Sequence, residues 1–166
     1  MRFEKISLDE WCNYWESNWP HTYPKEEIID MYDHIQLPKA GSPFAAGHDF
    51  YIPLNVIIPA NCKALLPTGI RWVTEEEDKD KFLMIVPRSG LGTKFGMRLT
   101  NTVGIIDADY CLAANEGHIM ASVMVDKELT LNAGDRFMQG IVMQYYRCGE
   151  ASDATRSGGF GSTGVR

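Results

Sequence analysis

Most of the chain is divided into short, β-branched segments separated by Gly, Pro, Asn and Asp, and this pattern is the strongest constraint on its fold. It begins after Leu37 and continues almost to the C-terminus. The segments expected to form strands are 55–60, 63–73, 81–90, 117–125, 128–134 and 136–146. Many short strands at close spacing favour a sandwich, jelly roll or barrel over βαβ units. We therefore expect an all-β domain over residues 37–148.

The first 36 residues have a different pattern, which predicts a small helical extension (1–36). In SLDEWCNYWE (7–16), aromatic residues recur at i, i+3 and i+4, as on the packing face of a helix. Ser7 and Glu10 have the spacing of a capping box. A second helix is expected after Pro24, in PKEEIIDMYDHI.

Charge and cysteine usage exclude several classes of protein. The net charge of −6 and the lack of any Lys/Arg run argue against a non-specific nucleic-acid binder. The four cysteines contain no CxxC pair, so we expect no zinc site and reduced thiols in a cytoplasm. No apolar run reaches the length of a membrane span, and no signal peptide is recognised. The charge run EEEDKDK (75–81) is expected to be a solvated turn.

The tail RSGGFGSTG (156–164) is chemically suggestive, although it lies at a chain end. Glycine backbone N–H groups can form an anion nest, and Arg156 can pair with a phosphate. Phe160 offers a flat face to a base, while Ser162 and Thr163 can donate hydrogen bonds. The composition alone equally fits a flexible tail. The tail lacks the lysine of a Walker-type P-loop.

Four internal segments carry residues suited to binding or catalysis, and each also has an ordinary structural explanation. The Arg, Ser and Gly of VPRSGLG (86–92) can hold an anion or form a surface turn. LTNTVGIIDADY (99–110) contains aspartates among apolar residues, which suit either a general base or a turn. The arginine of AGDRFMQGI (133–141) can form an ion pair, and AAGHDF (45–50) places an aspartate after a glycine.

Taken in order, AAGHDF, PRSGLG, NTVGIIDADY, GDRFMQG and RSGGFGSTG resemble the five motifs of the trimeric dUTP diphosphatases (dUTPases). The segment NEGHIMASV and the N-terminal extension are similar to a branch from Firmicutes and their phages. The resemblance implies a distorted jelly roll of the β-clip type in a homotrimer with active sites shared between subunits. It also implies a C-terminal arm (149–166) that closes over the site, and hydrolysis of dUTP to dUMP and pyrophosphate. That reaction limits uracil in DNA and supplies the precursor of dTMP.

The resemblance also assigns roles to individual residues. Asp107 would activate the water that attacks the α-phosphorus, and Tyr110 would pack beneath the deoxyribose. Asp49 would reach the Mg²⁺ cofactor through water. The remaining substrate contacts would be Arg88, Ser89, Gly90, Asn101, Gly104, Ile106, Gln139, Arg156, Phe160, Gly161, Ser162 and Thr163.

Two other readings remain open at this stage. The dCTP deaminases resemble this fold, but they use a glutamate base near the same place, whereas IIDADY supplies an aspartate. Some phage proteins of the dUTPase fold bind host repressors, so a regulatory protein partner is the second alternative. The extension and the loop CLAAN (111–115) are where such contacts would lie. The sequence predicts no nucleic-acid or membrane partner.

Overall fold

The computed structural model describes residues 1–149, and the helices expected in the extension are present. A short strand, β1 (Arg2–Lys5), precedes α1 (Leu8–Asn18) and α2 (Lys25–Asp33). Ser7 caps α1 by accepting a hydrogen bond from the backbone N–H of Glu10, as predicted. Pro24 is the N-cap of α2 rather than its first residue, because it adopts an extended conformation.

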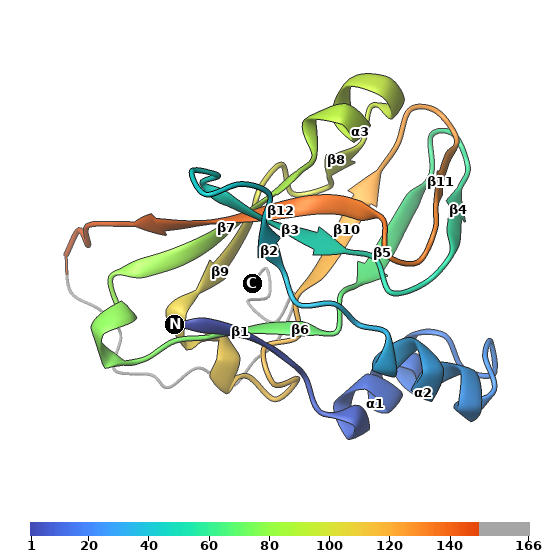
Figure 1. Ribbon diagram of the computed structural model, residues 1–166, viewed down its shortest axis with the longest axis horizontal. Coiled ribbons are helices and arrows are strands. Elements are labelled where there is room, and N and C mark those ends of the chain that lie inside the picture. Colours follow the sequence, from blue (N-terminus) through green and yellow to red (C-terminus); the bar gives the residue numbers. More distant parts are fainter. Residues whose placement is uncertain (150–166) are drawn as a thin grey trace.

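The rest of the described chain is built mostly of strands with a few short helical segments, which confirms the all-β fold class (Figure 1). The strands are β2 (Lys39–Ala40), β3 (Gly47–Tyr51), β4 (Val56–Ile58), β5 (Lys63–Pro67), β6 (Ile70–Val73), β7 (Lys81–Pro87), β8 (Arg98–Leu99), β9 (Gly104–Asp107), β10 (Met120–Met124), β11 (Leu129–Leu131) and β12 (Arg136–Gln144). Short helical segments are η1 (Glu76–Asp78), α3 (Ser89–Phe95) and η2 (Ala108–Leu112).

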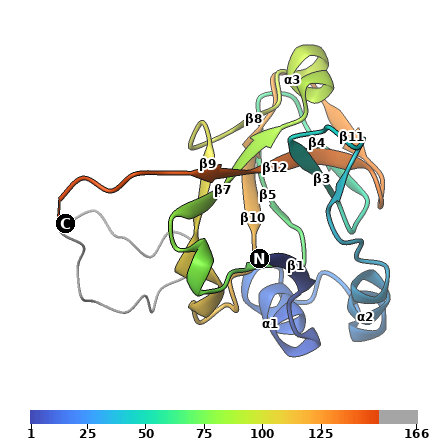
Figure 2. The same ribbon diagram turned by 60° about the vertical axis from the view of Figure 1, so that its left-hand side comes forward.

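The largest sheet is antiparallel, with the order β2-β3-β12-β7-β9. The last strand, β12, therefore lies in the middle of this sheet, between β3 and β7 (Figure 2). A second sheet has the order β5-β10-β8, and two pairs, β11-β4 and β1-β6, complete the structure. Strand β9 is at the edge of the large sheet, which leaves one side of its backbone unpaired within that sheet.

Three local predictions differ from the structure. The segment 63–73 is two strands, because Gly69 has a φ of 68° and turns the chain between β5 and β6. The segment 81–90 ends as a strand at Pro87, and helix α3 follows instead of a simple turn. The charge run 75–81 is not merely solvated, since Asp78 is buried and pairs with the Met1 amino group at 2.9 Å.

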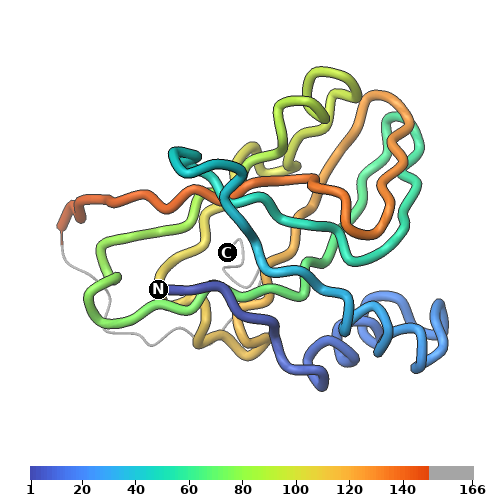
Figure 3. Tube along the Cα trace, viewed as in Figure 1, coloured from blue at the N-terminus to red at the C-terminus, as the bar shows by residue number. Residues whose placement is uncertain are grey.

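The extension and the β strands share one hydrophobic core. Trp11, Tyr14 and Trp15 of α1 are buried in the same cluster as Phe50 and Phe137 of the large sheet. Strand β1 pairs with β6 over four residues, so the blue N-terminal segment runs beside the chain near residue 70 (Figure 3). The extension is therefore packed against the domain along much of its length.

His118 is buried in this shared core. It is 0% exposed, and its Nε2 accepts a hydrogen bond from the Gly69 backbone N–H at 3.0 Å. Burial away from water lowers the pKa of His118 from 6.5 to about 3, because the charged ring loses its hydration.

This lowered pKa predicts a loss of stability on mild acidification. In the unfolded chain the imidazole of His118 takes up a proton below pH 6.5, whereas in the folded chain it stays neutral down to about pH 3. The unfolded state then binds more protons, so the free energy of unfolding falls by up to about 1.4 kcal/mol per pH unit below pH 6.5. Urea titrations at several pH values between 7 and 5.5 would measure this slope. In His118→Gln, whose amide oxygen can still accept from Gly69, the slope should be smaller; an equal slope would show that another group is responsible.

Among residues 1–149, no helix is both long enough and apolar enough to cross a membrane.

Candidate active site

One group of predicted residues surrounds the carboxylate of Asp49, on the large sheet. Asp49 lies on β3 opposite Gln139 of β12, and it is 9% exposed. Its Oδ2 is 2.9 Å from Nη1 of Arg88 and 3.1 Å from Nη1 of Arg136. The ion pair expected of Arg136 is therefore formed with Asp49, across the sheet.

The charges of this group leave an excess of hydrogen-bond donors. Two guanidinium groups meet one carboxylate, which gives a net positive site in a protein of negative net charge. Within the described residues, Nη1 of Arg88 is buried without a well-aligned hydrogen bond, although Asp49 is within ion-pair distance. An arginine held in this way can still donate to an anion such as a phosphate. Asp49 thus holds in place the two arginines that would bind such an anion.

Ser89, Gly90 and Gln139 lie next to this group. Arg88 is the N-cap of α3, and Ser89 and Gly90 are its exposed first residues. The side chain of Gln139, on β12, reaches Gly47, where a Cβ would come within 2.7 Å of the Gln139 Oε1. The glycine in AAGHDF therefore makes room for the glutamine side chain.

A second group lies along the edge strand β9 and the loop before it. Gly104 pairs with Ile85 of β7 and Ile106 with Leu83, while Asn101 is exposed in the preceding loop. An edge strand presents backbone N–H and C=O groups alternately outward, which is the donor and acceptor pattern needed to read the edge of a base.

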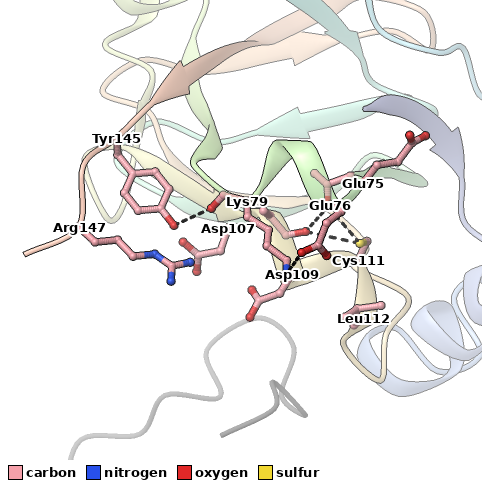
Figure 4. A pocket seen from close by; sticks show the side chains of 11 residues that line it. Glu75, Glu76, Lys79, Asp107, Asp109, Cys111, Leu112, Tyr145 and Arg147 are labelled. Carbon is pink, nitrogen blue, oxygen red and sulfur yellow. Dashed lines mark hydrogen bonds and ion pairs between the residues drawn. The ribbon is translucent and has the colours of Figure 1, made fainter. Parts of the chain in front are cut away.

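Asp107 ends β9 at the wall of a cavity of about 580 Å³. Figure 4 shows Asp107 and Asp109 with Arg147, which extends toward Asp107 from the segment after β12. The cavity is also lined by Thr74, Glu75, Glu76, Lys79, Ala108, Cys111, Leu112 and Tyr145. Asp107 is exposed, so it can meet a water molecule and a substrate.

Tyr110 belongs to the same corner but is buried, at 4% exposure, in η2. Its hydroxyl donates to the backbone carbonyl of His118 at 3.1 Å and accepts from the side-chain amide of Asn115 at 3.2 Å. The ring is thus held from the side of the 113–118 loop.

The two groups do not meet within one chain. Asp107 pairs with Phe82 near the start of β7. Arg88 comes six residues after Phe82, just beyond the end of the same strand. Six residues of extended strand span about 20 Å. Asp107 and Arg88 of one chain therefore lie far apart, near opposite ends of β7.

The substrate contacts predicted from the 149–166 arm lie outside the described residues, as does most of the arm itself. These contacts are Arg156, Phe160, Gly161, Ser162 and Thr163. Sequence reasoning missed the cavity residues Arg147 and Tyr145, for which no sequence signal existed beyond their position just after the last strand.

The residues that the structure describes do not form a cage for a metal ion. Among residues 1–149 no cluster of three or more His, Cys, Asp and Glu side chains could hold one. Asp49 is a single carboxylate whose Oδ2 is engaged by two arginines. A single carboxylate cannot hold Mg²⁺ on its own, so any Mg²⁺ here would keep most of its waters and take direct ligands from phosphate oxygens. The contact of Asp49 with Mg²⁺ stays a prediction.

A protein-family model described as dUTPase matches residues 33–164. The chain belongs to the dUTPase family. The deoxyuridine 5′-triphosphate nucleotidohydrolase of Lactococcus lactis is 32% identical over 147 residues, which cover 84% of this chain and 96% of that protein. The enzyme of the same name from Polynucleobacter asymbioticus is 35% identical over 149 residues, covering 83% and 95%. The prediction that the chain is an enzyme of this family is confirmed.

Solved dUTPase structures confirm the β-clip jelly roll. The Streptococcus mutans dUTPase superposes with a TM-score of 0.65 and 29% identity, covering 90% of this chain and all of that one. The dUTPase of the Staphylococcus aureus phage phi11 shares the fold with a TM-score of 0.59 at 16% identity, covering 72% and 90%. Streptococcal and phage dUTPases among these neighbours echo the predicted Firmicutes and phage branch only in part, because the phage structure is 16% identical and shows the fold alone.

Proposed function

We propose that this dUTPase-family protein hydrolyses dUTP to dUMP and pyrophosphate, with Asp107 as the general base. The observation that carries the proposal is the position of Asp107 at the end of the edge strand β9, exposed at the wall of a cavity. The family match over 33–164 supports the same substrate. In the cell, the reaction would keep uracil out of DNA and supply dUMP for dTMP synthesis, in the cytoplasm, where the unpaired cysteines suit reducing conditions.

The reaction needs mainly positioning, charge neutralisation and a base for the attacking water, which residues of this chain would supply. The oxygen of a water attacks the α-phosphorus as Asp107 accepts the water's proton. The bond from the α-phosphorus to the bridging oxygen breaks, and pyrophosphate leaves. Arg88, Gln139 and the first residues of α3 would hold the phosphates; Mg²⁺, when bound, would neutralise charge on the triphosphate.

Base and sugar would be recognised along β9 and η2. Outward backbone groups around Gly104–Ile106, with Asn101, would hydrogen-bond the uracil edge. A cytosine would present the wrong donors there and leave buried groups unpaired. Tyr110 would pack beneath the deoxyribose and leave no room for a 2′-hydroxyl. Arg156 and Phe160 would complete the site from the C-terminal arm.

We further propose that the active form is a homotrimer with shared sites. The separation between Asp107 and Arg88 along β7, about 20 Å by strand geometry, supports a site built from different subunits. A complete site would then combine the Asp49 group of one subunit with the Asp107 group of another.

The test is pyrophosphate release from dUTP, dCTP, dTTP and UTP, each with Mg²⁺ and with a chelator. Rapid release from dUTP alone, lost with the chelator, is the expected result. Ammonia released from dCTP would instead indicate a deaminase, and no reaction with any nucleotide would indicate a binding protein on this fold.

A further inference from the structure

The N-terminal extension contacts the loop that follows the candidate active-site helix η2. Ser7, the N-cap of α1, donates from its backbone N–H to Glu116 Oε2 at 2.8 Å and from its hydroxyl to Glu116 Oε1 at 2.6 Å. Glu116 therefore supplies the carboxylate that a capping box would have taken from Glu10. Both Glu116 oxygens are used, so the loop has one defined position relative to α1.

A second contact lies two residues further along the same loop. The ring of His118 packs against Trp11 and Tyr14 of α1, with ring centroids 6.0 and 5.2 Å away. Its Nε2 accepts from the Gly69 backbone N–H. The extension therefore holds the loop by a polar contact at Glu116 and by aromatic packing at His118.

The other side of the loop holds Tyr110. The His118 carbonyl and the Asn115 amide both hydrogen-bond the Tyr110 hydroxyl. Gly117, with a φ of 75°, packs so closely on η2 that a Cβ there would lie 2.7 Å from Cys111 Cα and 2.8 Å from the Tyr110 carbonyl oxygen. The loop is thus fixed to the tyrosine at both its side chain and its backbone.

We propose that residues 113–118, which we call the support loop, transmit the packing of the N-terminal extension to Tyr110 and so set the selectivity of the site for a 2′-deoxy sugar. Glu116 and Ser7 are positioning residues in this arrangement. The inference rests on the proposed function and deepens it, because it assigns a role to the extension in substrate discrimination. A ring held rigidly rejects a 2′-hydroxyl, whereas a ring free to shift makes room for it.

The test compares kcat/KM for dUTP with kcat/KM for UTP in four variants. Ser7→Ala removes the hydroxyl that contacts Glu116, and Glu116→Asn keeps a residue tolerant of the φ of 55° while shortening the side chain. Ser7→Thr is the conservative control, since it keeps the hydroxyl. Asn18→Ala is the matched helix control, because it removes the Asn18 bond to the Tyr14 carbonyl at the other end of α1.

In Ser7→Ala and Glu116→Asn the dUTP/UTP ratio should fall about tenfold, the effect of losing hydrogen bonds to a charged group. Ser7→Thr and Asn18→Ala should keep the wild-type ratio. Hydrogen exchange of amides 108–118 provides an activity-independent readout and should speed up only in the first two variants. An unchanged ratio with unchanged exchange would overturn the inference, and so would an equal fall in Asn18→Ala.

These outcomes are distinguishable from failure of the proposed function. If the wild-type protein releases no pyrophosphate from dUTP, the specificity role fails with it. The coupling of the extension to the support loop is then still decided by the exchange of amides 108–118.

Discussion

The Asp107→Asn variant should lose about a thousandfold or more of its rate of pyrophosphate release from dUTP, the order expected when a general base is removed. Asparagine has the same shape but cannot accept the proton of the attacking water. Asp107 is exposed at the end of β9, so the substitution should leave the fold intact. Steady-state assays with saturating Mg²⁺, alongside a thermal melt of each protein, would measure both effects.

Asp109→Asn is the matched control for this prediction. Asp109 lies two residues further along, lines the same cavity and carries the same charge. Its substitution should change the rate by much less, because the proposal gives it no contact with the attacking water. Equal losses in the two variants would indicate that the negative charge of the cavity matters, not a specific base.

The Trp11→Ala substitution should lower the free energy of unfolding by about 3–5 kcal/mol, as is typical when a fully buried large aromatic side chain is truncated. Trp11 is 0% exposed, and its Nε1 donates to the Ile28 carbonyl at 2.9 Å. Truncating its side chain would therefore leave an empty space between α1, α2 and the β domain. Urea denaturation at one fixed protein concentration would measure the change, since assembly would otherwise alter the apparent stability.

Trp19→Ala is the control here, because it removes the same side chain from the end of the same helix. Trp19 is 46% exposed, and its loss should have a much smaller effect on unfolding. Two separate unfolding transitions, with only the first affected by Trp11→Ala, would instead indicate that residues 1–36 fold as a unit of their own. The domain boundary at residue 37 remains a prediction that this experiment tests.

The fold was largely predictable because its strands are short and separated by turn residues. The helices of the extension also followed from local patterns, as the cap at Ser7 illustrates. The errors arose where a single residue's backbone conformation decided the outcome. The segment 63–73 contains Pro67 and Gly69, a turn signal that the prediction of one strand passed over, and Gly69 adopts the left-handed conformation.

The sequence proposes the residues of the candidate site but not their geometry. The order of the motifs proposes Asp107, Arg88 and Asp49, and their roles stay predictions. The sharing of Asp49 by two arginines depends on the pairing of β3 with β12, which no local pattern encodes. The contact between Ser7 and Glu116 joins residues 109 positions apart, and sequence patterns say nothing about such distant pairs.

The central position of β12 affects how the chain folds while it is synthesised on the ribosome. The large sheet cannot close until residues 136–144, which lie between β3 and β7, have been synthesised. Helix α1 is synthesised early, but its aromatic residues Trp11 and Tyr14 cannot pack against His118 until that residue has been added to the chain. Such non-local pairing slows folding and leaves apolar surface exposed in the nascent chain. Most of this chain must therefore be translated before the large sheet is complete.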